Sequence, residues 1–301
     1  MSTTLPLQLS AGSHAVILYH GLSSSPLELQ YLARGLNRAG YTVRLPVIDG
    51  YTHGRPSSEP RRCEDWIEDA LSEFDMMQGK YASVTVGGLC MGADLALCVA
   101  AQRSSLIAGV IAMSTTLHFD GWATTWTRRL LPLAPFFPFT GRIAVKESEP
   151  FGLKDERLRK FIAAQMKVSG GSSAGAAVLR VRDLLQARRL MRKTKLALKE
   201  ISAPTFVMHA REDDVASTRS AYDVVAGVQS TQVQCMMLNN SYHMISIDQE
   251  KAKVLSELED FVGKCSKSDR HRSAQVAPVA QVAHSAKIEA SHVSARNLAA
   301  V

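Results

Sequence analysis

The sequence lacks the segments that would place it in or across a membrane. No apolar run approaches the ~18 residues that a spanning helix needs, and the first residues have neither the basic start nor the apolar core of a secretory signal peptide. The cysteines are odd in number and do not follow the spacing of a disulfide framework or a zinc site. We therefore expect a soluble, cytoplasmic protein with no transmembrane segment.

Motifs for cofactors and nucleic acids are also missing. The chain has no phosphate-binding loop, no dinucleotide fingerprint and no cluster of side chains at metal-ligand spacing. Basic residues are not interleaved with aromatic ones, which make up 6% of the sequence. We expect no cofactor, no bound metal and no nucleic-acid partner.

The net charge of +7 is unevenly distributed along an otherwise ordinary composition, with 46% hydrophobic and 21% charged residues. Residues 1–116 and 201–263 carry net charges of −2 and −5, whereas 117–200 carry +10 and 264–301 carry +4. Attraction of an acidic partner is therefore expected at the middle segment. The alternative is that these charges lie on solvated helix faces.

Apolar runs of strand length alternate with helical patterns in two parts of the chain. This alternation predicts an α/β fold with a mostly parallel, doubly wound sheet. The expected strands are His14–Tyr19, Tyr41–Val47, Ser83–Gly87, Leu106–Met113, Pro204–Ala210 and Gln232–Leu238. The expected helices between them are Leu27–Ala39, Cys63–Met77, Met91–Gln102, Thr218–Val228 and Asp248–Gly263.

The alternation stops over 117–200, which predicts a helical cap inserted over the carboxyl edge of the sheet. Its helices are expected near Asp155–Val168 and Ala174–Lys199, with a hinge or helix break at Ser169–Ser173. The proline-rich run Leu130–Phe139 is interpreted as cap packing or as an apolar rim for acyl chains. The core is then formed by 1–116 and 201–263, and 264–301 are expected to be a disordered tail.

One stretch, Val84–Ala96, carries the strongest chemical signal. Gly88-Leu89-Cys90-Met91-Gly92 has the G-x-nucleophile-x-G spacing, with cysteine at the centre. A strained strand-to-helix turn leaves no room for side chains two residues before and after the nucleophile. Its place at a helix N-terminus favours a thiolate. The alternative is a glycine-rich turn with a buried, inert cysteine.

Two further polar residues whose side chains suit nucleophilic catalysis follow later strands. Asp213 comes after the strand ending at Ala210, and His243 comes after the strand ending at Leu238. Parallel strands bring such residues to one sheet edge. We expect His243 to accept the Cys90 proton, or to hold it as an ion pair, and Asp213 to orient the imidazole. Asp214 is the alternative acid.

Four segments together resemble the bacterial carboxylesterase and monoacylglycerol-lipase branch of the α/β-hydrolase superfamily. They are ILYHGLSSSP, VGGLCMGADLAL, APTFVMHAREDDV and LNNSYHMISIDQEK, and the resemblance spans about 14–263. It implies Cys90 as nucleophile, Asp213 as acid and His243 as base. It also implies an oxyanion hole made by the backbone N–H groups of Leu22 and Met91.

The sequence departs from the resemblance at two positions. The family usually has serine where this chain has Cys90, and glycine where it has Tyr242, which is expected to narrow the site. The remaining conspicuous side chains are expected to be structural. They are His20 under the oxyanion loop, His53 in a turn, Cys98 in the core, and Trp122, Trp126, Phe136 and Phe137 in the cap.

We expect a hydrolase of small-molecule carboxylic esters or thioesters that acts through a Cys90 acyl-enzyme. Because a thioester is activated toward amines, thiols and alcohols, the second hypothesis is an acyltransferase. It would use an acyl-CoA or acyl carrier protein donor, which a basic cap would suit. The third is a non-catalytic binding protein on the same fold.

Overall fold

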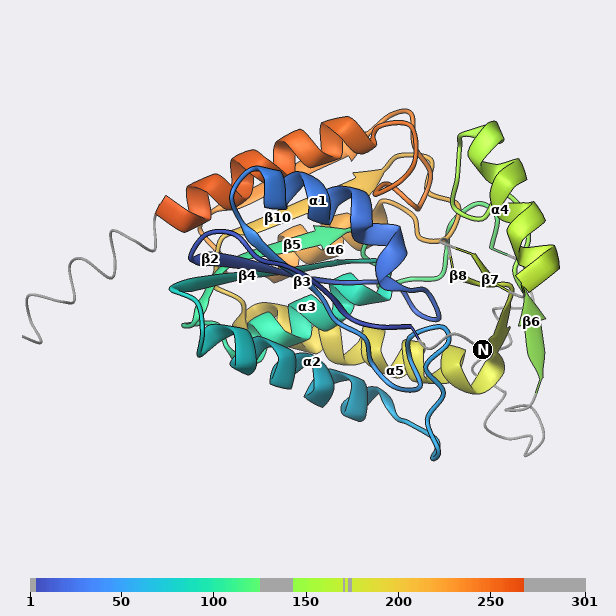
Figure 1. Ribbon diagram of the computed structural model, residues 1–301, viewed down its shortest axis with the longest axis horizontal. Coiled ribbons are helices and arrows are strands. Elements are labelled where there is room, and N and C mark those ends of the chain that lie inside the picture. Colours follow the sequence, from blue (N-terminus) through green and yellow to red (C-terminus); the bar gives the residue numbers. More distant parts are fainter. Residues whose placement is uncertain (1–3, 125–142, 170, 173–174, 268–301) are drawn as a thin grey trace, which may run out of the picture.

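The computed structural model describes residues 4–124, 143–169, 171–172 and 175–267 (Figure 1). Its centre is a seven-stranded sheet in the order β1-β3-β2-β4-β5-β10-β11, parallel except for β1 against β3. The strands are β1 (Leu7–Leu9), β2 (His14–Tyr19), β3 (Thr42–Leu45), β4 (Ser83–Leu89), β5 (Ile107–Met113), β10 (Thr205–Ala210) and β11 (Val233–Leu238). The predicted α/β class is confirmed. The sequence analysis missed β1, because three residues show too little periodicity.

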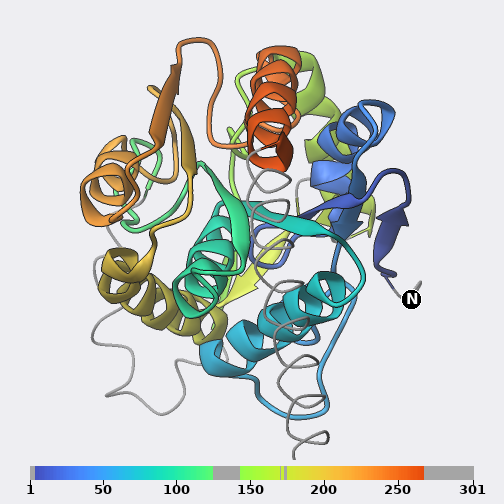
Figure 2. The ribbon, with the colours of Figure 1, turned by 90° about the vertical axis from the view of Figure 1, so that its left-hand side faces the viewer.

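Helices cover both faces of the sheet (Figure 2). One face carries α1 (Gln30–Arg38), which follows a 3-10 turn at Pro26–Leu29, and a helix at 251–267. The other carries α2 (Cys63–Gln78), α3 (Met91–Gln102), α5 (Val181–Ala197) and α6 (Arg219–Gly227). In β2, Ala15, Ile17 and Tyr19 pack on the second face and Val16 and Leu18 on the first. This alternation follows from the pleat of a strand and explains its continuous apolar run.

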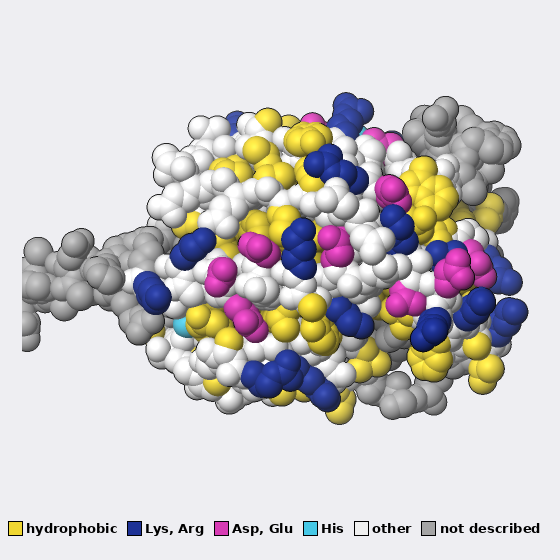
Figure 3. Space-filling model, turned by 90° about the horizontal axis from the view of Figure 1, so that it is seen from above, with side chains coloured by type: hydrophobic (Ala, Val, Ile, Leu, Met, Phe, Trp, Pro, Cys, Tyr) yellow, Lys and Arg dark blue, Asp and Glu magenta, His cyan; other side chains and the backbone are white. Residues whose placement is uncertain are grey.

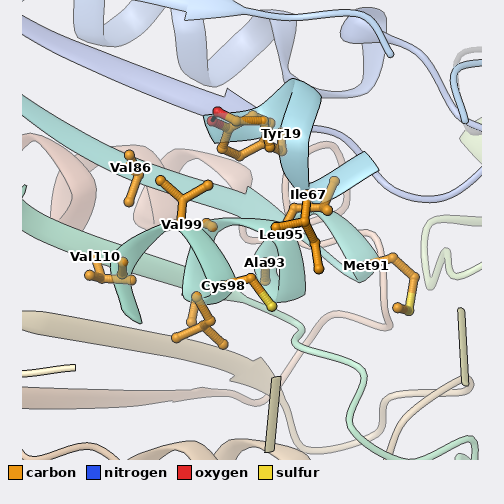
Figure 4. Packing of buried hydrophobic residues seen from close by; sticks show 14 of the residues in the cluster. Tyr19, Ile67, Val86, Met91, Ala93, Leu95, Cys98, Val99 and Val110 are labelled. Atoms are coloured by element: carbon orange, nitrogen blue, oxygen red, sulfur yellow. Dashed lines mark hydrogen bonds between the residues drawn. The ribbon is translucent and has the colours of Figure 1, made fainter. Parts of the chain in front are cut away.

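The helix that follows Cys90 is buried along almost its whole length. Every residue of α3 from Met91 to Ala100 is buried, and Leu95 and Val99 lie among the sheet and helix side chains of Figure 4. Cys98 is 3% exposed, and its Sγ lies 3.4 Å from Oγ1 of Thr194 in α5. Cys98 is therefore a core residue, as expected, and α3 is a rigid base for the residue at its N-terminus.

The middle segment has two parts with different roles. Beyond the carboxyl ends of the strands lie β6 (Ala144–Lys146), α4 (Glu156–Ser169), β7 (Gly171–Ser172), β8 (Gly175–Ala176) and β9 (Val178–Arg180) (Figure 1). In contrast, α5 packs against α3 in the helix layer, through residues such as Leu190. Figure 3 shows several lysine and arginine side chains at the end of the molecule that carries α4.

The prediction of a helix at Ala174–Lys199 is wrong for the first residues of that range. Gly175 has φ +120°, and Val178–Arg180 pair with β6, so the helix begins at Val181. The break expected at Ser169–Ser173 agrees with the end of α4 at Ser169. Long-range strand pairing overrode the local helical pattern here.

The last helix is shifted from the expected Asp248–Gly263 to 251–267. Asp248 is not helical, because its carboxylate accepts the backbone N–H groups of Lys154, Asp155 and Tyr242. The helix passes 264 because Cys265 is buried with the apolar face. The expected tail beyond 267 and the run Leu130–Phe139 lie outside the described residues. Among the helices described, none combines the length and apolar character needed to cross a membrane.

Candidate active site

The three residues that the sequence predicted to act together lie at one edge of the sheet. Cys90 directly follows β4, and Asp213 and His243 follow β10 and β11. Cys90 and His243 line a cavity of about 130 Å³ between the sheet edge and the insertion. Asp213 is 3% exposed and lies behind His243. The fold therefore brings these residues together, although Cys90 and His243 are more than 150 residues apart in the sequence.

Cys90 occupies a strained turn between β4 and α3. Its φ of 58° and ψ of −126° are costly for a residue with a side chain. A Cβ atom on Gly88 would lie 2.2 Å from the carbonyl carbon of Gly92, and one on Gly92 would lie 2.1 Å from the carbonyl oxygen of Tyr19. The spacing of the motif therefore has the steric cause expected from the sequence. The cysteine itself is half-buried, not sealed in the core.

The carboxylate of Asp213 contacts the imidazole of His243. Nδ1 of His243 lies 2.8 Å from Oδ2 and 3.0 Å from Oδ1 of Asp213. Burial alone would raise the pKa of Asp213, but the charge and hydrogen bond of His243 outweigh it, so this pKa is lowered. The pair can therefore hold an ionised carboxylate in a buried place.

Asp214, the alternative acid, makes different contacts. Its Oδ2 accepts the backbone N–H of Gly152 at 3.0 Å, and its Oδ1 accepts that of His243 at 3.3 Å. Burial raises the pKa of Asp214. Asp214 therefore contacts the backbone of His243 and not its ring. Through Gly152 and His243 it links the insertion to the loop after β11.

The other ring nitrogen of His243 is the one available for chemistry. Nε2 is buried and has no nitrogen or oxygen partner within the residues that the structure describes. Burial would lower the pKa of His243, but the charges of Asp213 and then Cys90 raise it well above its usual value. The Cys90 sulfur also lies 3.4 Å from the hydroxyl oxygen of Thr116, a neighbour that the sequence analysis missed.

The backbone N–H groups of Leu22 and Met91 are free to bind a ligand oxygen. Both residues line the cavity with Cys90, and in the described part of the chain neither N–H donates a hydrogen bond. Met91 is the first residue of α3, where the helix leaves its N–H unpaired. These are the positions that the resemblance implied for an oxyanion hole.

His20 supports the loop that contains Leu22. Its ring nitrogens lie 2.8 Å from the carbonyl oxygen of Gly21 and 2.9 Å from the hydroxyl of Thr52. Burial lowers the pKa of His20 to about 4, so the ring is neutral at neutral pH. The expected structural role of His20 is confirmed. His53 donates its backbone N–H to the Ser24 carbonyl at 2.7 Å, which fits its expected place in a turn.

Glu28 is a buried carboxyl group beside the cavity that the sequence analysis did not identify. It accepts the backbone N–H of Gly21 at 2.5 Å and the hydroxyl of Ser24. Burial raises its pKa to about 7, against the opposing effect of these two hydrogen bonds. The available signal was a glutamate on the apolar face of the Pro26–Arg38 segment.

Apolar residues of the insertion close the cavity opposite Cys90. They include Phe151, Met166, Leu179 and Leu184. Tyr242 is not among the described residues that line the cavity: its ring packs on Trp122, with centroids 5.3 Å apart. The expected narrowing by Tyr242 is therefore wrong. Trp122 packs as expected, although it is 60% exposed, and the positions of Trp126, Phe136 and Phe137 lie outside the described residues.

Comparisons with known proteins agree with this fold. The family model described as serine aminopeptidase, S33 matches residues 11–250. The chain is similar to a thermostable monoacylglycerol lipase of Bacillus sp. (strain H-257), at 24% identity over 88% of this chain and 96% of that protein. It is also similar to a carboxylesterase of Bacillus subtilis (strain 168), at 24% identity over 87% and 97%. The structure of Paleococcus ferrophilus monoacylglycerol lipase superposes with a TM-score of 0.72, at 16% identity over 88% of this chain and all of that one.

Proposed function

Because the chain belongs to the serine aminopeptidase S33 family of α/β-hydrolase enzymes, we propose that it hydrolyses small carboxylic esters and thioesters through an acyl-enzyme on Cys90. The relatives named as a monoacylglycerol lipase and a carboxylesterase support ester substrates. One observation carries the thiol mechanism: Cys90 and His243 line a single cavity, and Asp213 contacts the far nitrogen of that imidazole.

Acylation begins when the Cys90 sulfur attacks the substrate carbonyl carbon and its proton passes to Nε2 of His243. The carbonyl oxygen becomes an oxyanion, which the backbone N–H groups of Leu22 and Met91 stabilise. The tetrahedral intermediate then expels the alcohol or thiol, which takes the proton from Nε2. Asp213 holds Nδ1 and stabilises the imidazolium while it exists.

Deacylation uses the same residues in reverse order. A water molecule attacks the thioester carbonyl of the acyl-enzyme and gives its proton to Nε2 of His243. The carboxylic acid leaves, and the sulfur of Cys90 regains its proton. The apolar wall of Phe151, Met166, Leu179 and Leu184 suits a short or medium acyl group.

Replacement of the sulfur tests the proposal. Cys90→Ala should abolish turnover of p-nitrophenyl butyrate and of butyryl thioesters, while circular dichroism and Tm show an intact fold. Cys98→Ala is the matched control, because Cys98 lies inside the core on the helix that follows Cys90. Unchanged turnover in Cys90→Ala would refute the proposal. Cys90→Ser distinguishes a general hydrolase site, which keeps ester hydrolysis, from one that requires a thiol.

Acyl transfer is the second candidate, and the presence of cysteine in the turn between β4 and α3 favours it. A thioester intermediate reacts readily with amines and thiols. Turnover of a butyryl thioester with and without added amine or thiol acceptors separates the two. Formation of the butyryl amide or a new thioester at the expense of butyrate would identify transfer.

A further inference from the structure

A second cavity, of about 430 Å³, lies beside the active site and is rich in arginine. It is formed by the loop 50–62 on one side and by β8, β9 and the start of α5 on the other. The described arginines that line it are Arg55, Arg61, Arg62, Arg180 and Arg182. We call this cavity the arginine groove.

The arginines of the groove differ in how they are neutralised. Arg55 pairs with Asp49 at 2.7 Å, and Arg61 pairs with Asp69 at 2.5 Å. Arg62 and Arg180, both exposed, have no carboxylate within ion-pair distance among the residues that the structure describes. Neither guanidinium group is therefore held in an ion pair, although the charge of Arg180 also acts on Asp183.

Arg182, on the same side of the groove, is only weakly neutralised. It meets its sequence neighbour Asp183 at 3.4 Å and is half exposed. Besides Asp183, the described acidic residue on the groove lining is Glu59, which is exposed. The lining as described is therefore positive in balance.

The groove and the catalytic cavity share a wall. Ala176 lines both, and along β9 and the start of α5 the side chains alternate between them: Leu179 and Leu184 face the catalytic cavity, and Val178, Arg180 and Asp183 line the groove. The wall is tied to the oxyanion loop, because the N–H of Ala176 donates to the Ser23 carbonyl at 2.8 Å. An anion in the groove therefore lies beside the substrate-binding backbone.

We propose that the arginine groove binds the phosphate-bearing part of the acyl donor while its acyl group reaches Cys90. This proposal rests on the proposed thioesterase or acyltransferase function and narrows its substrate to anionic acyl donors. The planar guanidinium groups of Arg62 and Arg180 suit bidentate contacts to phosphate oxygens, which lysine would not match. Loss of such charge-assisted hydrogen bonds typically weakens binding about tenfold or more.

Paired substrates with one acyl group test the proposal. Butyryl-CoA carries phosphates, and the butyryl thioester of N-acetylcysteamine carries none. In Arg62→Gln/Arg180→Gln, KM for butyryl-CoA should rise about tenfold or more, whereas kcat/KM for the neutral thioester stays within twofold. Arg38→Gln, an exposed arginine on α1, should change neither. Equal effects on both thioesters, or on neither, would overturn the groove as a donor site.

Binding measured without turnover keeps this result separate from the proposed function. S-methyl-CoA has the phosphates but no acyl group or free thiol, and calorimetry should show it binding to the wild-type protein and to Cys90→Ala, but tenfold more weakly to the double arginine variant. Binding should also weaken with added salt. If no ester or thioester is turned over, the proposed enzymatic function is refuted. The titration with S-methyl-CoA still shows whether the arginine groove binds a phosphate-bearing ligand. Binding to phosphatidylglycerol vesicles through the same arginines, without S-methyl-CoA binding, would refute a soluble donor.

Discussion

Among single residues, Asp213 and Asp214 differ in what their carboxylates contact, and this predicts unequal effects on catalysis. Asp213→Asn removes the charge beside Nδ1 of His243 and presents the wrong hydrogen-bonding partner, so kcat should fall by roughly 10²–10⁴-fold. Asp214→Asn keeps an acceptor for one of its two backbone N–H partners and leaves the contact between Asp213 and the imidazole in place, so it should cost less than about tenfold. Steady-state kinetics on p-nitrophenyl butyrate compares them, and a larger loss in Asp214→Asn would reverse the assignment.

The buried carboxyl group of Glu28 should make the stability of the protein depend on pH. Its pKa is raised from 4.5 to about 7 in the folded protein, so folding favours the protonated carboxyl. The resulting contribution to the free energy of unfolding is fully present below pH 4.5 and is lost as the pH rises through about 7. It amounts to at most about 3 kcal/mol. Glu28→Gln keeps an acceptor for the Gly21 N–H and does not titrate.

Urea unfolding at pH 5 and pH 8 measures this difference. The wild-type protein should lose more unfolding free energy than Glu28→Gln between these values, because only the wild type must ionise a buried carboxyl. An identical loss in the two proteins would show that Glu28 does not titrate in this range.

Sequence reasoning identified Cys90, Asp213 and His243 because each follows an expected strand and each lies in a recognisable segment. It missed Thr116 and Glu28 for a physical reason. Their roles depend on contacts with Cys90, Gly21 and Ser24 that only the folded chain creates. Residues with chemistry of their own are visible in a pattern, whereas residues that position others are not.

At the scale of elements, the turn between β4 and α3 is the most constrained feature. Gly92→Ala would place a Cβ atom 2.1 Å from a backbone oxygen of β2, so we expect a loss of roughly 3 kcal/mol or more in unfolding free energy. Gly79→Ala, at the end of α2, is the matched control, because its nearest contact would be 3.6 Å and its φ is −70°. Denaturant unfolding of both variants measures the difference, and equal stability would refute the steric account.

Most elements were predictable because their apolar periodicity matches the faces they bury. The exceptions share a cause in non-local contacts. Residues 175–180 pair with β6, and Asp248 binds three distant backbone N–H groups where the last helix was expected to begin. Neither interaction leaves a signal in a local window of sequence.

At the scale of the whole molecule, the chain is a hydrolase core with an insertion that completes the site. The insertion supplies the apolar wall of the cavity and one side of the arginine groove, while α5 belongs to the core layer. All five cysteines are free, and a cytoplasmic location is predicted from the sequence alone. That location and the boundaries at 116, 200 and 263 stay predictions.

The acyl-enzyme on Cys90 is the central claim, and mass spectrometry of the trapped protein tests it directly. The protein is mixed with p-nitrophenyl butyrate, quenched in acid within the first turnovers and digested for peptide mapping. We predict one added butyryl group on the peptide that contains Cys90, and none in Cys90→Ala. Turnover without an adduct, or a butyryl group found only on the exposed Cys235, would contradict the account.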